Sequence, residues 1–260
     1  MTRLLDPDEP APVILTQGSD PDCPFLILCD HAGRRVPRRL GDLGLRQADL
    51  VRHIAWDIGV AGTCAHLAAA LGATTISQVY SRLVIDCNRT PGHVSSIPRV
   101  SEMTEIPGNL NLGDAERCQR EAEILLPYHQ AIESEIDRRQ AVGQETVVIA
   151  LHSFTPVYMG MARPWHAGVL HDRNPGFALA LGQALRQATG QMIGDNEPYR
   201  LTDASDFTVP HHAEARNLPY VELEIRQDLI DEEAGQRRWA ELLRRLLPEV
   251  LAAHLPKVPC

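Results

Sequence analysis

The stretch FLILCDHAGRRVP, residues 25–37, decides the fold, because a wholly apolar run stops abruptly at charged and polar residues. Residues 25–29 have the composition of a strand that is buried on both faces. A turn alone would end such a strand, yet Asp30 and His31 stand directly at its tip. In parallel α/β sheets, ligands bind just beyond the carboxyl ends of the strands. The pair therefore indicates a functional site at one edge of a sheet.

Strand and helix patterns alternate along the rest of the chain. Further strand-like runs lie at residues 73–80, 82–87, 146–152, 167–171 and 219–225. Helical patterns lie at residues 58–71, 114–140 with a kink at Pro127, 177–188 and 234–253. Such alternation predicts an α/β fold with a mostly parallel mixed sheet and helices on both faces. No internal repeat or interdomain linker is visible, so residues 1–260 are expected to form a single domain.

One segment, residues 90–113, does not follow this alternation. It contains three prolines and three glycines and has no hydrophobic periodicity. A stretch this long without regular structure inside a compact domain is usually a functional loop or disordered. Because it directly follows Asn88-Arg89, we expect an ordered, irregular loop at the active site.

Composition excludes several classes of function. The chain has 260 residues, a formal net charge of −9 and a pI near 5.6, which disfavours binding to nucleic acid or to an anionic membrane. No run reaches transmembrane length, and the N-terminus lacks the apolar core of a signal peptide. The six cysteines include no C-x-x-C pair, as is typical of reduced thiols. We expect a soluble cytoplasmic protein whose partner is a small anionic molecule bound by a local cluster of arginines.

Polar residues stand at the ends of several predicted strands. Besides the first strand, polar pairs follow or close three others: Asn88-Arg89, His152-Ser153 and His171-Asp172. The carboxyl ends of parallel strands meet at one edge of a sheet, so these residues are expected to converge on one place. On the last strand, alternation puts Glu222, Glu224 and Arg226 on a common face.

Two imidazoles and a carboxylate from separate elements suit a catalytic zinc ion, which keeps a fourth position for water. We predict His31 and His152 as ligands, although either histidine could instead bond a backbone carbonyl. Asp57 leads as the third ligand, but an Asp before a helical run is also an ordinary N-cap. Asp30 competes for that role, yet a neighbour of His31 fits better as support for a ligand.

Glu224 could serve as the general base that activates water and later protonates a leaving amine. The alternative is an ion pair with Arg226 or another arginine. Arg82 and Arg89 could clamp a substrate carboxylate, or could instead pair with Asp86. The sequence has no serine-hydrolase elbow, P-loop, dinucleotide-binding motif or H-E-x-x-H.

Several long segments resemble the N-formylglutamate amidohydrolase family. The matching segments, between residues 28 and 230, are LCDHAGRRVP, HIAWDIGVAG, SRLVIDCNRTPG, IPGN, IALHSFTP, RPWHAGVL and LPYVELEIRQDLI. The resemblance implies a metal-dependent hydrolase of amino-acid catabolism that releases formate from an N-formyl amino acid such as N-formylglutamate. It also implies a zinc-peptidase-like (phosphorylase/hydrolase-like) fold, related to zinc carboxypeptidases and aspartoacylase-like deacylases.

The wider group to which this family is similar has a metal His, an Asn-Arg pair for the substrate carboxylate, a second metal His and a catalytic Glu. Here these roles correspond to His31, Asn88-Arg89, His152 and Glu224. Arg34 stands where the carboxypeptidase-like pattern has a glutamate ligand, three residues after the first His. This departure moves the carboxylate-ligand role to Asp57 and leaves the identity of the metal open.

The likeness around RPWHAGVL and VPHHAEARNLPY adds Arg163 and His212 to the pocket. His212 would protonate the leaving amine or hold the tetrahedral intermediate, with His211 as the alternative. The predicted set is then Glu224 and His212 for catalysis, Arg82, Asn88, Arg89, Arg163 and Arg226 for substrate binding, and His31, Asp57 and His152 for Zn²⁺ or another divalent metal.

Three functions compete at this point. The first is a zinc-dependent amidohydrolase for a small N-formyl or other short N-acyl amino acid. The second is a non-catalytic or regulatory protein that binds an acidic metabolite on the same fold, which the departure at Arg34 favours. The third is a related deacylase or carboxypeptidase-like peptidase, which would need a more open cleft than a deformylase.

Overall fold

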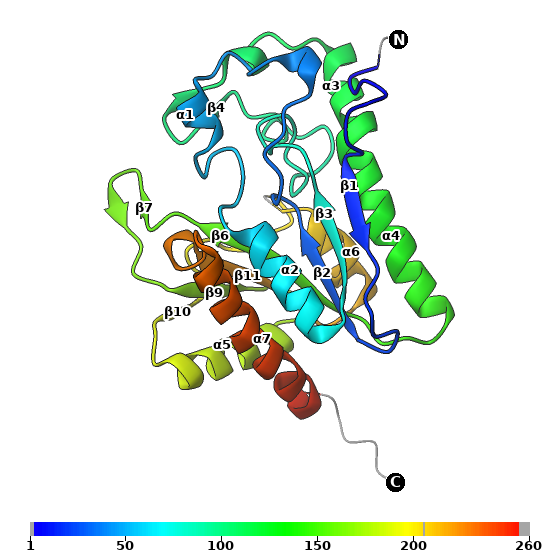
Figure 1. Ribbon diagram of the computed structural model, residues 1–260, viewed down its shortest axis with the longest axis vertical. Helices are drawn as coiled ribbons and strands as arrows, with labels where there is room; N and C mark the ends of the chain where they lie inside the picture. The colour runs from blue at the N-terminus through cyan, green and yellow to red at the C-terminus, as the bar shows by residue number, and fades with distance from the viewer. Residues whose placement is uncertain (1–2, 205, 255–260) are drawn as a thin grey trace.

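A seven-stranded sheet runs through the centre of the molecule and carries helices on both faces (Figure 1). The computed structural model describes residues 3–204 and 206–254. The strand order is β1 (Val13–Thr16), β3 (Thr74–Gln78), β2 (Phe25–Cys29), β6 (Val147–Phe154), β11 (Tyr220–Arg226), β9 (Ala167–Leu170) and β10 (Ile193–Asp195). The four strands from β3 to β11 are parallel, whereas β1 and β9 join antiparallel to them. The predicted single α/β domain with a mostly parallel mixed sheet is confirmed.

The central strands are buried on both faces because their side chains alternate between two hydrophobic cores. On β2, Leu26 and Leu28 face one core, while Phe25, Ile27 and Cys29 face the other. Helices α2 (Val60–Leu71), α5 (Gly176–Thr189) and α7 (Glu233–His254) cover the second core. Helices α4 (Leu126–Ala141) and α6 (Thr208–His212) lie against the first. Among the described residues, no helix is long and apolar enough to cross a membrane.

Residues 82–87, predicted as a strand, are buried but form turns outside the sheet. Their polar backbone groups bond to neighbouring loops and to a helix instead of a strand. Asn109 Nδ2 donates to the Leu83 carbonyl at 2.8 Å, and Arg120 donates to the Val84 carbonyl at 2.9 Å. An apolar run in a sequence indicates that its residues are buried, but it does not indicate which groups form hydrogen bonds with their backbone.

The long helix expected at 114–140 is interrupted before its proline. It comprises α3 (Asp114–Arg120), a π-helical turn η3 (Glu121–Leu125) and α4, whose first turn contains Pro127. Proline has no N–H to donate to the preceding turn, and a π turn is a common form of such a break. A π turn therefore stands directly ahead of Pro127, where the sequence predicts a kink.

The pair His171-Asp172 does not join the other strand ends. Because β9 is antiparallel to β11, its carboxyl end points to the opposite edge of the sheet. There Nε2 of His171 lies 2.7 Å from Oδ1 of Asp195. The expectation that all the polar strand ends converge is wrong for this strand, since an apolar run does not encode strand direction.

The irregular segment 90–113 is ordered above the parallel strands. It contains the small hairpin β4 (Val100–Ser101) and β5 (Thr104–Glu105), followed by the short helix η2 (Pro107–Asn109). The short helices η1 (Arg38–Leu40) and α1 (Gln47–Leu50) and a second hairpin, β7 (Val157–Tyr158) and β8 (Met161–Ala162), complete this end of the molecule.

A buried ion pair fastens α4 to the start of β2. Nε of Arg139 lies 2.8 Å from Glu135 Oε1, and both side chains are almost inaccessible. The same guanidinium donates to the carbonyls of Cys23 and Pro24. Glu135→Ala would leave this cation buried without its carboxylate, so we expect a loss of about 3–5 kcal/mol in the free energy of unfolding.

Urea denaturation of the two proteins measures this loss. The matched control is Glu133→Ala, since Glu133 lies on the exposed side of the same helix and pairs loosely with Arg216 at 3.5 Å. The control should change stability by no more than about 0.5 kcal/mol. Equal midpoints for both variants would contradict the stabilising role of the buried pair.

Candidate active site

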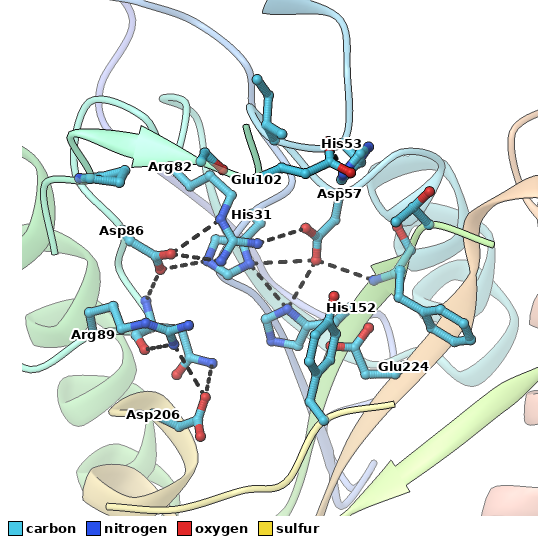
Figure 2. A pocket seen from close by; sticks show the side chains of 18 of the residues that line it. His31, His53, Asp57, Arg82, Asp86, Arg89, Glu102, His152, Asp206 and Glu224 are labelled. Carbon is cyan, nitrogen blue, oxygen red and sulfur yellow. Dashed lines mark hydrogen bonds and ion pairs between the residues drawn. The ribbon is translucent and has the colours of Figure 1, made fainter. Parts of the chain in front are cut away.

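Three side chains from separate elements meet above the carboxyl ends of β2 and β6 (Figure 2). Nδ1 of His31 and Nδ1 of His152 are 3.2 Å apart. Oδ2 of Asp57 lies 3.0 Å from Nδ1 of His152 and 3.5 Å from Nδ1 of His31. All three residues are buried, and their ligand-type atoms lie within 4.8 Å of one another. The predicted metal ligands therefore form one cluster.

The second nitrogen of each imidazole faces another carboxylate. Nε2 of His31 bonds Oδ1 of Asp86 at 2.7 Å. Nε2 of His152 lies 3.2 Å from Oδ2 of Asp30, close enough for an ion pair although not aligned as a hydrogen bond. Carboxylates in this position fix the imidazole proton on Nε2 and turn the Nδ1 lone pair toward a metal. Two such lone pairs and the Asp57 oxygen then face one another, and this donor set fits a divalent cation.

Asp57 reaches the cluster because the chain doubles back after β2. Its N–H donates to the His31 carbonyl at 2.9 Å, and its carboxylate accepts from the Ser153 N–H at 3.2 Å. The alternative role as an N-cap is wrong: α2 has Gly59 at its N-cap position and no side-chain cap. Gly59 has φ +83°, and a Cβ there would lie 2.0 Å from the Ile230 carbonyl oxygen. Only glycine fits this close turn.

The charges around the imidazoles favour a cation. Arg82 pairs with Asp86 at 2.7 Å and with Asp57 at 3.3 Å. Burial alone raises the pKa of Asp30, but the adjacent His152 imidazole, 3.2 Å away, lowers it to about 2. Burial likewise acts against ionised Asp86, but the Arg82 and His31 charges hold its pKa well below the usual range. Asp30, Asp57 and Asp86 are therefore ionised at neutral pH beside the single guanidinium of Arg82. The two further positive charges that balance them are supplied by protons on His31 and His152 or, in their place, by a bound divalent cation.

Glu224 stands beside the cluster on the neighbouring parallel strand. In the β11–β6 register it lies opposite His152, so both side chains point to the same face. Glu224 is buried, and its Oε2 has no hydrogen-bond partner among the described residues. Burial raises the pKa of Glu224 to about 7, and the charge of Asp57 adds to this effect. The alternative pairing with Arg226 is not seen, because Arg226 bonds Asp228 at 2.8 Å.

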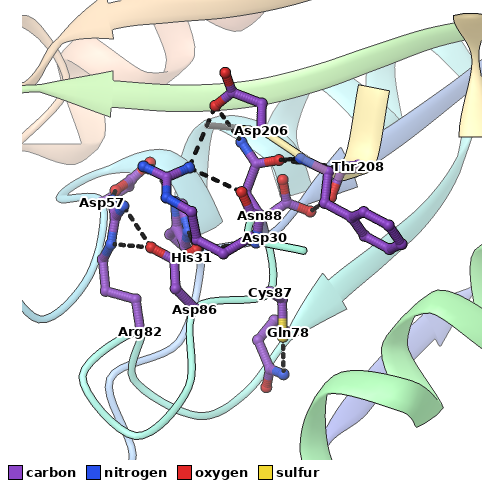
Figure 3. A network of polar contacts seen from close by, with 12 residues as sticks. Asp30, His31, Asp57, Gln78, Arg82, Asp86, Cys87, Asn88, Asp206 and Thr208 are labelled. Atoms are coloured by element: carbon purple, nitrogen blue, oxygen red, sulfur yellow. Dashed lines mark hydrogen bonds and ion pairs between the residues drawn. The ribbon is translucent and has the colours of Figure 1, made fainter. Parts of the chain in front are cut away.

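On the opposite side of the histidine pair lie Arg89 and Asp206 (Figure 2). NH1 of Arg89 donates to the Asn88 carbonyl at 2.8 Å and lies 3.3 Å from Oδ1 of Asp206. Oδ1 of Asn88 accepts from the N–H groups of Phe207 and Thr208, each at 3.0 Å (Figure 3). Asn88 is thus held from behind, and its amide nitrogen donates to Oδ1 of Asp206 at 3.4 Å. The amide of Asn88 and the guanidinium of Arg89 therefore both face the cavity side and share one carboxylate oxygen as their acceptor.

A cavity of about 440 Å³ joins these groups. Of the predicted site residues, it is lined by His31, Asp57, Arg82, Asn88, Arg89, His152 and Glu224. The 90–113 segment contributes Ser95, Pro98, Val100, Ser101 and Glu102. Glu102 bonds Arg52 at 2.6 Å and approaches the Met159 N–H at 3.5 Å, which connects the two hairpins at the mouth of the cavity.

Three predicted site residues do not line this cavity. Arg163 contacts the cavity wall, with its guanidinium 4.6 Å and 4.7 Å from the ring centres of Tyr158 and Tyr199, which do line it. His212 is buried and bonds His129 at 2.9 Å. Arg226 pairs with Asp228 outside the cavity. The structure therefore places His212 and Arg226 away from the other predicted residues.

Sequence reasoning did not assign several residues of the site. The sequence predicts Asp86 only as an ion-pair partner of an arginine, yet Asp86 also bonds His31 at 2.7 Å. Its position two residues before Asn88 was a usable signal. Asp206 and Tyr199 lie in a region without a motif, and only the packing of residues 197–204 and 206–209 over the strands brings them to the cavity.

Two imidazoles and a carboxylate beside a buried glutamate, at the edge of an α/β sheet, are typical of metal-dependent hydrolases. The family model of N-formylglutamate amidohydrolase matches residues 23–231. The chain therefore belongs to the N-formylglutamate amidohydrolase family, a family of hydrolases.

Two solved structures support the fold. A gene product of Agrobacterium tumefaciens is 35% identical, with 96% of this chain and 99% of that chain covered and a TM-score of 0.92. An N-formylglutamate amidohydrolase from Ralstonia eutropha is 20% identical, with 94% and 99% covered and a TM-score of 0.65. No curated protein matches the chain.

The carboxylate that braces His31 should control metal affinity. Asp86→Asn keeps the size of the side chain but weakens its bond to Nε2, and we expect a 10- to 100-fold loss of zinc affinity. Competition with a chromogenic chelator measures this loss. Asp195→Asn makes the same change in the His171–Asp195 pair at the opposite edge of the sheet, and it should leave the affinity unchanged. Equal affinities for both variants would exclude the bracing role.

Proposed function

We propose that this protein hydrolyses the amide bond of a small N-formyl or short N-acyl amino acid, such as N-formylglutamate, to a carboxylic acid and the free amino acid. The observation that carries the proposal is the mutual approach of His31, Asp57 and His152 within 4.8 Å. Membership in the N-formylglutamate amidohydrolase family supports an amide as the bond that is hydrolysed. Asp57 would supply the carboxylate ligand that the carboxypeptidase-like pattern has at the position of Arg34, and its place beside both histidines supports an enzyme over a protein that has kept only the fold.

His31, Asp57 and His152 would hold the metal, and zinc suits two imidazoles and one carboxylate with a position left open. A zinc ion there would polarise the amide carbonyl and lower the pKa of water to about 7. Asp86 and Asp30 orient the two imidazoles from behind, as their distances of 2.7 Å and 3.2 Å indicate.

Glu224 is proposed as the proton-transfer residue. Its buried carboxylate borders the cavity and has one oxygen without a partner among the described residues. It would accept a proton from the attacking water as the bond from oxygen to the acyl carbon forms. It would then return that proton to the leaving nitrogen as the C–N bond breaks. With Glu224 in both steps, a separate histidine acid is not needed, and His212 is given no catalytic role.

Arg89 and Asn88 are proposed to bind the α-carboxylate of the substrate. Arg89 lies across the histidine pair from Glu224 (Figure 2), and Asn88 precedes it in the chain, so the scissile amide would span the space between the two groups. A guanidinium and an amide N–H₂ together match the geometry of a carboxylate. Arg82 is occupied by Asp57 and Asp86 and is proposed to orient them, while Arg163 supports the wall of the cavity through Tyr158 and Tyr199.

The test is formate release from N-formylglutamate by zinc-loaded protein. We expect turnover that a chelator abolishes and added zinc restores, with metal-free protein as the matched control. N-acetylglutamate and other N-formyl amino acids in the same assay measure how narrow the acyl and side-chain preferences are. A zinc-loaded protein without turnover on any of these substrates would contradict the proposal and favour a binding function.

A further inference from the structure

Two buried histidines bond one another behind the active site without lining the cavity. His129 lies on α4 and His212 at the end of α6. Nδ1 of His129 is 2.9 Å from Nε2 of His212, and their rings stack with centroids 5.2 Å apart. Nε2 of His129 lies 2.8 Å from the carbonyl oxygen of Cys87. The two imidazoles thus connect two helices to the segment that carries Asn88.

The direction of these hydrogen bonds follows from the chemistry of the groups. A carbonyl only accepts, so Nε2 of His129 donates to Cys87. Burial lowers the pKa of His129 to about 4, so its ring is neutral and Nδ1 carries a lone pair. That lone pair accepts the proton on Nε2 of His212. Nδ1 of His212 then keeps a lone pair and has no partner among the described residues. Only this arrangement of protons satisfies the Cys87 carbonyl and both bonds together.

Cys87 stands between two residues of the site. Asp86 on one side bonds Nε2 of His31, and Asn88 on the other belongs to the proposed carboxylate clamp. The Cys87 carbonyl belongs to the peptide that joins Cys87 to Asn88, so a shift of this carbonyl would move Asn88. Asp86 has further attachments of its own, to Arg82 at 2.7 Å and from its N–H to the Ser96 carbonyl at 2.7 Å, so its bond to His31 would be kept. The Cys87 side chain is a weaker attachment of this segment: it packs in the first core, and its sulfur, a weak acceptor, accepts from the Gln78 amide at 3.1 Å (Figure 3).

His212 acts on the same segment through α6. The first amides of this helix, those of Phe207 and Thr208, donate to the side chain of Asn88. The Thr208 hydroxyl donates to Asp30 at 3.0 Å. The histidine pair therefore connects the two groups that hold Asn88. One is the Cys87 carbonyl, in the peptide bond before Asn88, and the other is the start of α6, whose amides bond the Asn88 side chain.

We propose that His129 is a positioning residue for the binding of the substrate α-carboxylate, which it controls through the Cys87 carbonyl, and that His212 fixes the proton arrangement His129 needs. The proposal rests on the proposed function in one respect, since it takes Asn88 and Arg89 as the clamp. It assigns His212, a predicted catalytic residue, a place behind the site.

Two substitutions of His129 separate the two bonds. In His129→Gln the amide nitrogen can occupy the place of Nε2 and still donate to Cys87. In His129→Asn the shorter amide occupies the place of Nδ1, so it reaches His212 and leaves the carbonyl unpaired. His129→Gln therefore keeps the hydrogen bond to the Cys87 carbonyl, whereas His129→Asn loses it although both side chains are equally polar amides.

Steady-state kinetics of the zinc-loaded proteins use N-formylglutamate and its α-amide, N-formylisoglutamine, which lacks only the α-carboxylate. For His129→Asn we expect KM for N-formylglutamate to rise about tenfold while kcat stays within about threefold, as for the loss of one ordered contact to a charged group. His129→Gln should resemble wild type. On the α-amide, all three proteins should behave alike, because the clamp has no carboxylate to bind.

Zinc content and thermal midpoints are recorded for each protein to detect general damage. A rise in KM for both substrates alike, a loss of zinc in His129→Asn, or wild-type kinetics in that variant would overturn the proposal. If wild type hydrolyses neither substrate, the proposed function is wrong. Calorimetric binding of the same two compounds then tests whether His129 positions the α-carboxylate clamp. In that case we expect His129→Asn to bind N-formylglutamate about tenfold more weakly than wild type and the α-amide equally well, with His129→Gln unchanged on both. Equal binding by all three proteins, or no detectable binding, would overturn the positioning role.

Discussion

Glu224→Gln is expected to lower kcat by about 10²–10⁴-fold while the protein binds zinc as wild type does. The amide has nearly the shape of the carboxylate but cannot take a proton from water. Glu224 is not in the ligand cluster of His31, Asp57 and His152, so metal content should not change. Formate release and elemental analysis on the same preparation measure both quantities.

Glu222→Gln is the informative comparison, because Glu222 lies two residues earlier on β11, is equally buried and also borders the cavity. If Glu224 is the base, Glu222→Gln should retain far more activity than Glu224→Gln. A Glu224→Gln variant with near wild-type kcat, or a larger loss in Glu222→Gln, would show that the base has been assigned to the wrong carboxylate.

His152→Ala should lose both metal and activity. It removes one of the two imidazoles from a cluster of three ligands and leaves Asp30 without its counter-charge. Changes in the groups that only brace a ligand already cost 10- to 100-fold in metal affinity, so loss of the ligand should cost at least about 100-fold. Elemental mass spectrometry on protein purified without chelator measures the zinc that remains.

His171→Ala is the matched control for this variant. His171 also forms a close pair with an aspartate, but at the opposite edge of the sheet, so its removal should leave zinc content and turnover unchanged. Full zinc occupancy in His152→Ala would remove His152 from the ligand set. Loss of zinc from both variants would point to general unfolding, which circular dichroism would detect.

The sequence by itself determined the buried strands and the residues at their ends. The apolar runs at 25–29, 146–152 and 219–225 became β2, β6 and β11. Since these three strands are parallel and adjacent, the rule for parallel sheets was sufficient to bring His31, His152 and Glu224 together.

Tertiary structure alone decided which residues hold that set in place. An apolar composition indicates burial, but it indicates neither the direction of a strand nor the partner of a polar group. For this reason the sequence predicts His171 at the wrong edge of the sheet and predicts a strand at residues 82–87, which form turns. His212 was expected in the pocket, yet α4 and α6 pair it with His129 behind it. Bonds such as that between Asp86 and His31 join residues 55 positions apart. They exist only once packing has fixed both segments, and no local pattern of residues encodes them.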